Sequence, residues 1–285
     1  MDSGDPSLAE SSKVPIYVIT LLQRADRQAH VATLQRSSAL PVQVFPAITP
    51  HSHAEVPSYD RAWRARHFGY DLTLGEIGCL LSHRALWELC VRSDRILCIL
   101  EDDVELGDNF SACLRAALAW TGEWDVLRFL AERWDRWRVP VWRLDAEHVL
   151  AQYPRPAMGT AAYLLQPHAA QRLLALTEQI RIPVDQVIDR FWAHHLRVRV
   201  VEPHPVRIAH YCPSVIAERG WAASHGSLPR PLWRRLQRDL RNGLERALGL
   251  IYSLDCARQA WRCRYPASIF LRRLPKGRLR SPADR

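Results

Sequence analysis

Long apolar runs are missing from this chain of 285 residues, which has no uninterrupted apolar stretch of 18 residues. A membrane-spanning helix needs about 20 such residues, so the sequence predicts no transmembrane span. Residues 1–12 are polar and acidic and lack the apolar core of a secretory signal. We therefore expect no signal peptide and a cytoplasmic location.

Cysteine pairs with the spacing of zinc sites or redox motifs are also missing. The chain has seven cysteines, an odd number, and no C-x-x-C motif. Cys79, Cys90 and Cys98 lie in apolar surroundings in the sequence. This usage indicates buried, reduced thiols in a cytoplasmic protein rather than a disulfide framework.

Excess charge is absent from most of the chain and concentrated at its end. Residues 228–285 contain 15 Lys and Arg against four Asp and Glu, a net charge of +11. Residues 1–227 contain 24 basic and 26 acidic residues, a net charge of −2. A nucleic-acid binder would carry its basic residues among aromatics on the domain itself, so we expect no nucleic-acid partner.

The stretch 95–104, RILCILEDDV, joins a short apolar run to three consecutive carboxylates. Such a run predicts a strand buried on both faces, as in a parallel sheet covered by helices. Ligands bind beyond the carboxyl ends of such strands. Side chains alternate along a strand, so Glu101 and Asp103 are expected to point one way and Asp102 the other. Converging carboxylates favour a hard cation such as Mg²⁺ or Mn²⁺, although a solvated strand end is the plainer interpretation.

Strand and helix patterns alternate along residues 14–227, which predicts one α/β domain with an open, mostly parallel sheet. Residues 1–13 are expected to be disordered. Strands are expected at 15–22, 42–48, 95–101, 124–130, 159–165 and 197–201, and helices in between. Residues 49–71 read as a long loop, and residues 131–157, with three tryptophans, as a ligand-facing insert.

Several polar residues near these strand ends are candidates for a binding site. Arg24 and Arg27 follow the first strand, where they would meet a phosphate at a helix N-terminus, or else be ordinary surface charges. Thr73 and Glu76 have the spacing of a capping box that opens a helix to about residue 93. His83 lies within this helix beside Ser82, where packing is the plainer role.

Six segments together resemble glycosyltransferase family 25, in family order over residues 14–216. The pair G-E-I-G-C-x-x-S-H and I-L-E-D-D-V is the most specific part. Thr20 departs from the pattern, because the family usually has Asn there. The matching segments are VITLLQRADR, LTLGEIGCLLSHRALW, ILCILEDDVEL, GTAAYLLQPHAAQRLL, IPVDQVIDRFW and PHPVRIAHYCPSVI.

The resemblance implies a GT-A-type, Rossmann-like fold and an inverting transfer of a hexose, with galactose favoured, from a UDP-sugar in the presence of Mn²⁺ or Mg²⁺. The acceptor would be a lipooligosaccharide, a lipopolysaccharide or another glycan, including a lipid-linked one. It implies Asp103 as the primary metal ligand, with Glu101 or Asp102 assisting. Asp185 would be the acceptor-side carboxylate, although an acid at a helix N-terminus is an equal interpretation.

The remaining residues implied by the resemblance fall into two groups. A late histidine would complete the metal site, with His210 favoured over His204 and a surface role open for both. The nucleotide sugar would be bound by Arg24, Arg27, Glu76, Ser82, His83 and Asp102. Alternatives are a catalytically silent binding protein of the same fold and a protein glycosyltransferase. A metal-dependent phosphohydrolase could also use Glu101 and Asp103, but it would need further His and Asp motifs that this sequence lacks.

The basic tail, residues 228–285, lies outside the resemblance and predicts an amphipathic helix opening near Pro231. An apolar stripe includes Leu240, Leu244, Leu248 and Ile251. Such a helix suits an anionic membrane surface, on the inner face of the membrane for a cytoplasmic protein. The alternative is that the helix docks on the catalytic domain.

Overall fold

The computed structural model describes residues 14–38, 40–132, 139–153, 155–209, 240, 243–254 and 258. The expected disorder of residues 1–13 therefore lies outside the described residues, as does the start of the predicted tail helix. The elements from the start of the described chain to residue 119 are β1 (Ile16–Thr20), α2 (Ala25–Ser37), β2 (Val42–Pro46), η1 (His53–Glu55), α3 (Arg61–His67), α4 (Leu74–Ser93), β3 (Leu97–Glu101), β4 (Val104–Leu106) and α5 (Phe110–Ala119). The later elements are η2 (Thr121–Glu123), β5 (Val126–Arg128), β6 (Val139–Arg143), β7 (Val149–Gln152), β8 (Ala162–Leu165), α6 (Pro167–Leu176), α7 (Val184–Asp189), α8 (Phe191–His194), β9 (Val198–Glu202) and β10 (Val206–Ile208).

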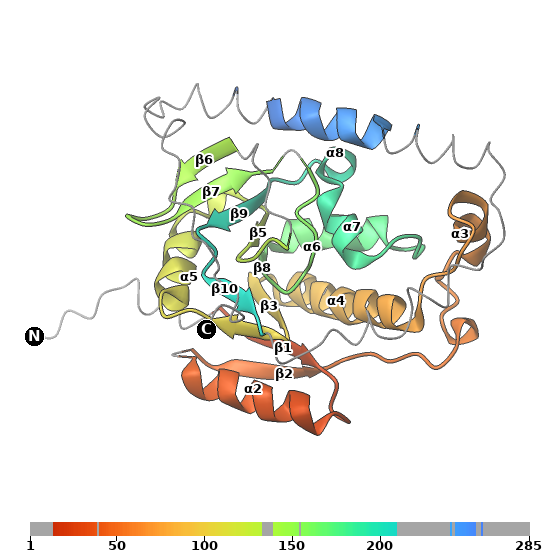
Figure 1. Ribbon diagram of the computed structural model, residues 1–285, viewed down its shortest axis with the longest axis horizontal. Helices are drawn as coiled ribbons and strands as arrows, with labels where there is room; N and C mark the ends of the chain where they lie inside the picture. The colour runs from red at the N-terminus through yellow and green to blue at the C-terminus, as the bar shows by residue number, and fades with distance from the viewer. Residues whose placement is uncertain are drawn as a thin grey trace, which may run out of the picture.

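Eight strands form one twisted sheet in the order β2-β1-β3-β8-β5-β9-β7-β6 (Figure 1). The strand pairings give six strands one direction, whereas β7 and β8 run the opposite way. The predicted α/β fold with a mostly parallel, open sheet is confirmed. The two reversed strands make the sheet mixed.

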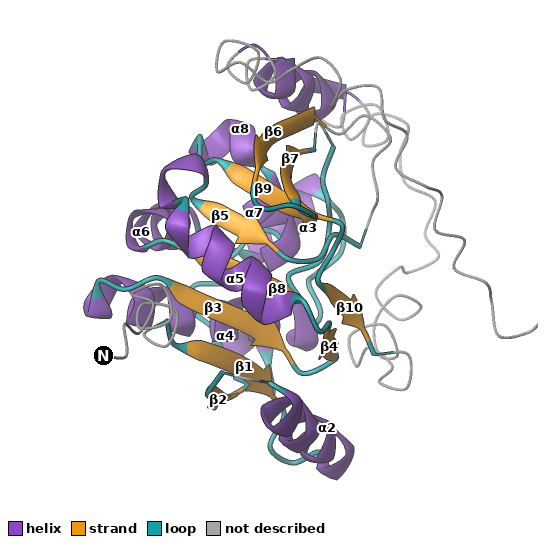
Figure 2. Cartoon of the chain, turned by 90° about the vertical axis from the view of Figure 1, so that its left-hand side faces the viewer, coloured by secondary structure: helices purple, strands orange, loops and turns teal. Residues whose placement is uncertain are grey.

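Helices cover both faces of this sheet (Figure 2). Alternate residues of β3 show why, because Cys98 and Leu100 join the apolar core beneath α2 and α5. Leu97 and Ile99 join the core on the other face, which is formed with α4, α6, α7 and α8. The unbroken apolar run of β3 thus reflects a strand buried on both sides, as predicted.

The predicted long loop and the predicted insert both contain regular structure. Residues 49–71 include η1 and α3, and the insert 131–157 includes the hairpin of β6 and β7, which extends the sheet at its edge. Val141 and Leu150 of this hairpin are buried in the core. The insert is therefore at least partly a sheet extension, and Trp142 packs against Trp120 with ring centroids 5.0 Å apart.

The part of the tail that the structure describes is helical at residues 240, 243–254 and 258. It lies beside α8 at one end of the molecule (Figure 1). No helix among the described residues is long and apolar enough to cross a membrane.

Candidate functional site

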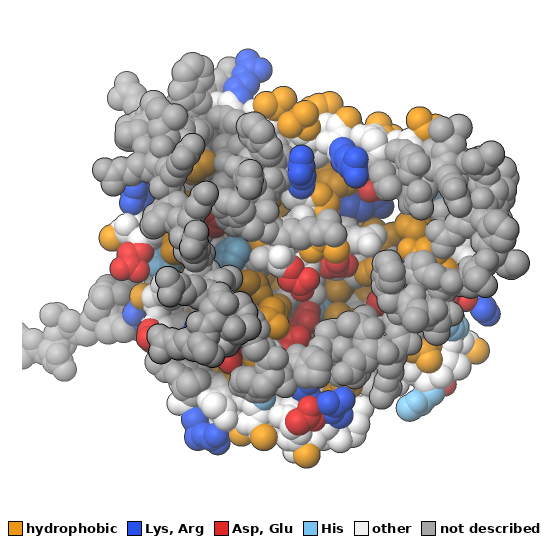
Figure 3. Space-filling view, in the orientation of Figure 1, with side chains coloured by type: hydrophobic (Ala, Val, Ile, Leu, Met, Phe, Trp, Pro, Cys, Tyr) orange, Lys and Arg blue, Asp and Glu red, His pale blue; other side chains and the backbone are white. Residues whose placement is uncertain are grey.

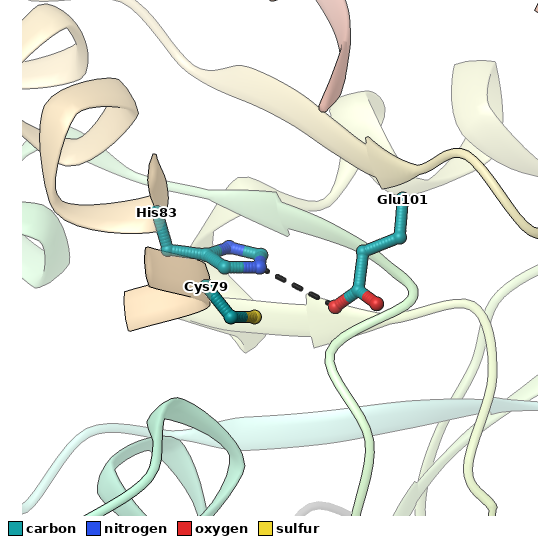
Figure 4. A group of neighbouring side chains, drawn as sticks. All are labelled: Cys79, His83 and Glu101. Carbon is teal, nitrogen blue, oxygen red and sulfur yellow. Dashed lines mark hydrogen bonds and ion pairs between the residues drawn. The ribbon is translucent and has the colours of Figure 1, made fainter. Parts of the chain in front are cut away.

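The acidic residues lie at the carboxyl end of β3, where Glu101 is the last residue of the strand and Asp102 and Asp103 follow it. The nearby strands β4 and β10 form a separate two-stranded sheet. Glu101 continues the alternation of Leu97 and Ile99 and therefore faces α4. Its Oε1 atom lies 3.3 Å from Nε2 of His83, a fully buried residue of that helix (Figure 4). A helix residue and a strand end far apart in the sequence thus meet at one point.

His83 is held in place by a buried chain of polar groups. Its Nδ1 atom lies 2.8 Å from the hydroxyl of Tyr163, and that oxygen accepts a hydrogen bond of 2.8 Å from the indole N–H of Trp87. Tyr163 can then donate its own proton to Nδ1, which leaves the imidazole proton on Nε2, facing Glu101. This arrangement suits a carboxylate at Glu101 as acceptor.

Thr160 reaches Glu101 from the loop that precedes β8, and its hydroxyl donates to the same Oε1 atom. Burial alone would raise the pKa of Glu101, but the hydrogen bonds from His83 and Thr160 outweigh it and hold the pKa below its usual value. Glu101 is therefore ionised and fixed in orientation.

A buried ion pair that the sequence did not reveal anchors the same loop. Arg128 Nη2 lies 3.0 Å from Asp189 Oδ1, and both side chains are almost fully buried. Arg128 also donates to the Met158 carbonyl at 3.0 Å, and Met158 N–H donates to Asp189 at 2.9 Å. The Arg128–Asp189 pair thus holds the backbone of Met158, two residues before Thr160, by hydrogen bonds to its carbonyl and N–H groups. Asp189 lies within the matching segment IPVDQVIDRFW, but Arg128 lies outside all six segments, so the sequence alone does not pair the two.

Asp102 points away from Glu101, toward α2, as strand alternation predicts. It accepts hydrogen bonds of 2.7 Å from the Thr20 hydroxyl and from Arg27 Nη1. Arg27 is buried. The contact of Arg27 with a nucleotide stays a prediction. In the structure, Arg27 and Thr20 both donate hydrogen bonds to the Asp102 carboxylate.

Asp103 differs from its two neighbours because the negative charges of Glu101 and Asp102 outweigh the positive charge of Arg27 in its surroundings. Its Oδ1 atom is buried and has no hydrogen-bond partner among the described residues. Burial, together with Glu101 and Asp102, raises the pKa of Asp103 from 3.8 to about 7. A cation beside this carboxylate would relieve both the burial cost and the repulsion.

Asp185, in the first turn of α7, faces the same region. Burial is the main cause that raises its pKa, and Glu101 and Glu76 add to the effect, whereas Arg128 opposes it. Cys79 lies among the same groups: burial raises the pKa of its thiol well above the usual value, and Glu101, Asp185, Asp103 and Glu76 contribute. Acidic side chains from β3, α4 and α7 thus converge, and Figure 3 shows acidic groups in the middle of one face.

One group of metal-ligand type stands out in the part of the chain that the structure describes. The ligand atoms of Cys79, His83 and Glu101 lie within 4.8 Å of one another (Figure 4). A thiol is a soft ligand that suits Zn²⁺, whereas Mg²⁺ and Mn²⁺ prefer oxygen. Of this group, only Glu101 matches the predicted hard-cation site.

Other predicted site residues have clear structural partners. Glu76 and Thr73 form the predicted capping box. Ser82 is fully buried; its hydroxyl donates to the Gly78 carbonyl and accepts from Ile48 N–H, each at 2.8 Å. A Cβ at Gly78 would meet the Ile48 carbonyl oxygen at 2.4 Å. The Gly and Ser of this motif thus hold α4 against the chain after β2.

The last predicted residues lie at the edge of the site. Arg24 is partly exposed at the start of α2 and pairs with Asp26 at 2.7 Å. His204 lies in the turn between β9 and β10. His210 is outside the described residues, but Ala209, the residue before it, donates its N–H to the Asp103 carbonyl at 2.7 Å.

Comparison with known proteins identifies relatives of this chain. Residues 13–188 match the model of glycosyltransferase family 25, described as LPS biosynthesis protein. A glycosyltransferase 25 family member of Anopheles gambiae is 29% identical over 209 residues, which cover 65% of this chain and 34% of that protein. A putative glycosyltransferase of Haemophilus influenzae is 27% identical over 197 residues, or 66% of this chain and 67% of that protein.

A mouse protein named inactive glycosyltransferase 25 family member 3 is 28% identical over 199 residues, covering 63% of this chain and 32% of that protein. The match thus spans about a third of the animal relatives and two thirds of the bacterial one. The family model covers more than half of this chain and includes β3, α4 and most of α7. The chain belongs to glycosyltransferase family 25.

Proposed function

We propose that the protein transfers a hexose, with galactose favoured, from a UDP-sugar to a hydroxyl group of a lipooligosaccharide or lipopolysaccharide glycan, with inversion at the anomeric carbon. Family membership supports the transfer of a sugar, and the description of the family as an LPS biosynthesis protein supports the acceptor class. The observation that carries the proposal is the buried Oδ1 atom of Asp103, which lacks a partner among the described residues and lies near Glu101.

The side chains fit the divalent ion that the family implies. Asp103 offers an unpartnered buried oxygen, and Glu101 is held ionised beside it. Asp102 is the weaker second ligand, because Thr20 and Arg27 already bind its carboxylate. We therefore assign Mn²⁺ or Mg²⁺ to Asp103 and Glu101. When bound, the ion would supply positive charge that stabilises the departing nucleoside diphosphate.

Asp185 is the proposed base. Its carboxylate would take the proton of the acceptor hydroxyl as that oxygen bonds to the anomeric carbon. The bond from this carbon to the diphosphate breaks in the same step, and its electron pair leaves with the diphosphate. Burial strengthens Asp185 as a base because it raises the pKa. Arg24, partly exposed at the start of α2, is the proposed contact for the diphosphate.

The test is a screen of UDP-sugars, including UDP-galactose, with Mn²⁺ and a soluble oligosaccharide acceptor. We expect UDP release with at least one donor, transfer to the acceptor, and loss of both in an Asp103→Asn variant. Asp108→Asn is the matched control, because Asp108 is an exposed acid close by in the sequence. The absence of turnover with every donor and acceptor, in protein shown to be folded, would contradict the proposal.

A second candidate function is a silent nucleotide-sugar or glycan-binding protein of the same fold. The observation in its favour is the similarity to the mouse relative named inactive. Calorimetry with UDP-sugars separates the two functions. Binding of a UDP-sugar without UDP release or transfer would favour the silent protein, whereas binding with turnover would favour the enzyme.

The proposed compartment is the cytoplasm. Cys79, Cys90, Cys98 and Cys113 are free thiols in the part of the chain that the structure describes. Burial raises the pKa of Cys90 to about 12, which keeps that thiol protonated and unreactive. Free, buried thiols of this kind support a reducing compartment.

A further inference from the structure

The helical segment 243–254 docks on the α/β domain, called the body below, through a small set of contacts. Glu245 forms an ion pair of 3.1 Å with Arg190. The Tyr252 hydroxyl donates to the Leu196 carbonyl at 2.9 Å, and its ring lies 4.8 Å from that of Phe191. Together these contacts fix one side of the helix against α8 and the residues next to it.

The docked side of this helix carries two small residues, an acid and a tyrosine, and none of the leucines. Gly249 and Ser253 are buried, and Glu245 and Tyr252 are half-buried. At about 100° per residue these four positions lie within one third of the helix circumference. The Ser253 hydroxyl donates to the Gly249 carbonyl at 2.8 Å, so its polar group is satisfied within the helix.

The opposite side carries the apolar residues, and it faces outward. Leu244 is 60% exposed, Ile251 64% and Leu254 61%, and Leu240 and Leu250 are also more than half exposed. Burying a Leu or Ile side chain stabilises a folded protein, so leaving this row in water forgoes a large stabilisation. Docking on the body therefore does not explain why the sequence places leucines there.

We propose that this outward face, defined by Leu240, Leu244, Leu248, Ile251 and Leu254, inserts into the headgroup region of an anionic membrane while the docked side stays on the body. Charge identifies the partner. Residues 228–285 carry a net charge of +11, whereas the rest of the chain carries −2. An apolar helix face within an arginine-rich sequence fits an anionic lipid surface, because each basic residue near such a surface strengthens the binding.

The position of this face also fits a membrane-bound enzyme. Hydrophobic side chains line the upper edge of the view in Figure 3, where Figure 1 draws the C-terminal helix. A group of acidic side chains lies in the middle of the viewed face instead, and others lie near its left and lower edges. A membrane against the edge would leave the acidic region facing sideways, open to a soluble donor. It would also keep those carboxylates off the anionic surface that repels them.

The experiment is flotation of the full-length protein with vesicles. One set contains phosphatidylcholine alone and the other adds phosphatidylglycerol. The test variant is Leu244→Gln with Ile251→Gln, which removes two outward apolar side chains without changing charge or any docking contact. Val91→Gln is the control, because Val91 is an exposed apolar residue on α4. Flotation needs no turnover, so its result is independent of the proposed reaction.

We expect wild type and Val91→Gln to float with the anionic vesicles, less so in high salt, and neither to float with phosphatidylcholine alone. The double variant should bind at least about tenfold more weakly while melting at the same temperature. Failure of wild type to float, or equal flotation of the double variant, would overturn the proposal. The proposal would also be overturned if wild type sediments as a dimer and the double variant as a monomer, because the apolar face would then bind a second copy of the chain.

Discussion

Nδ1 of His83 lies 2.8 Å from the Tyr163 hydroxyl, and this contact links the interior of the protein to its acidic site. Tyr163 is buried, and the indole of Trp87 donates to its oxygen. The hydroxyl proton is thus available to His83, and the imidazole presents its own N–H to Glu101, 3.3 Å away. One buried hydroxyl orients a histidine that, in turn, orients a carboxylate of the site.

The first prediction concerns Tyr163→Phe. Loss of the hydroxyl leaves the Trp87 N–H and His83 Nδ1 without this partner, so the free energy of unfolding should fall by about 1–3 kcal/mol. Urea denaturation measures the change. Tyr17→Phe is the control, because Tyr17 is half-buried and the described structure gives its hydroxyl no hydrogen bond. Equal stability of Tyr163→Phe and wild type would show that the chain of bonds contributes nothing.

The sequence predicts those parts of the site that depend on local pattern. The apolar run before Glu101 gives both the buried strand and the side of the sheet on which Glu101 lies. The Thr73 and Glu76 spacing gives the start of α4. The order of these segments also resembles a known family, which the comparisons confirm.

Other parts of the site depend on long-range contacts that carry no local signal. Arg128 and Asp189 belong to different elements, and nothing in their neighbours indicates that they form a buried pair. The edge hairpin of β6 and β7 is missed because the tryptophans and charges of 131–157 obscure its short strands. Only the folded sheet shows where these residues go.

The second prediction is that Asp103→Asn has opposite effects on turnover and on stability. Turnover should be lost, as it should when EDTA is added to wild type. The metal-free variant should be more stable than wild type at pH 8, because it no longer buries a carboxylate near Glu101 and Asp102. The pKa of Asp103 is about 7 in the folded protein and 3.8 in the unfolded chain, so the folded state binds more protons between these values. The stability of wild type therefore falls as the pH rises from 3.8 to about 7.

Thermal melting in EDTA at pH 5 and pH 8 checks the stability difference, which should shrink at pH 5 because Asp103 is then protonated. Adding Mn²⁺ should raise the melting temperature of wild type and of Asp108→Asn, but not of Asp103→Asn. Turnover retained after both EDTA and the substitution would show that the ion is bound elsewhere or is not needed.

The third prediction separates two roles of Asp185. If Asp185 is the base, Asp185→Asn should lower kcat by about 10²–10⁴-fold and leave UDP binding nearly unchanged. The raised pKa of Asp185 should appear in wild type as a loss of kcat at low pH, beginning above the usual pKa of an aspartate. Steady-state kinetics and calorimetry measure these quantities. A rise in acceptor KM alone would mean that Asp185 positions the acceptor. A stability loss of about 0.3–1 kcal/mol with normal kinetics would assign it to the helix dipole.

The last prediction concerns His194, the buried last residue of α8. Its Nδ1 accepts from the Leu196 N–H at 3.0 Å, so Nε2 holds the proton and donates to the Ile188 carbonyl at 3.0 Å. Burial lowers the pKa of His194 from 6.5 to about 4, and the positive charge of Arg172 adds to the effect. The folded protein thus favours the neutral ring, which bridges two backbone groups.

Below pH 6.5 the unfolded chain binds a proton at this position, whereas the folded protein does so only near pH 4. The contribution of His194 to the free energy of unfolding is therefore complete above pH 6.5 and decreases as the pH falls. At pH 5 this contribution is smaller by about 2 kcal/mol. Urea denaturation at pH 7.5 and pH 5 measures this loss. His194→Asn should be less stable at pH 7.5 and should lose less stability on acidification. His67→Asn, at an exposed histidine of α3, should keep the wild-type pH dependence. The same behaviour in His194→Asn would show that other groups cause the pH dependence.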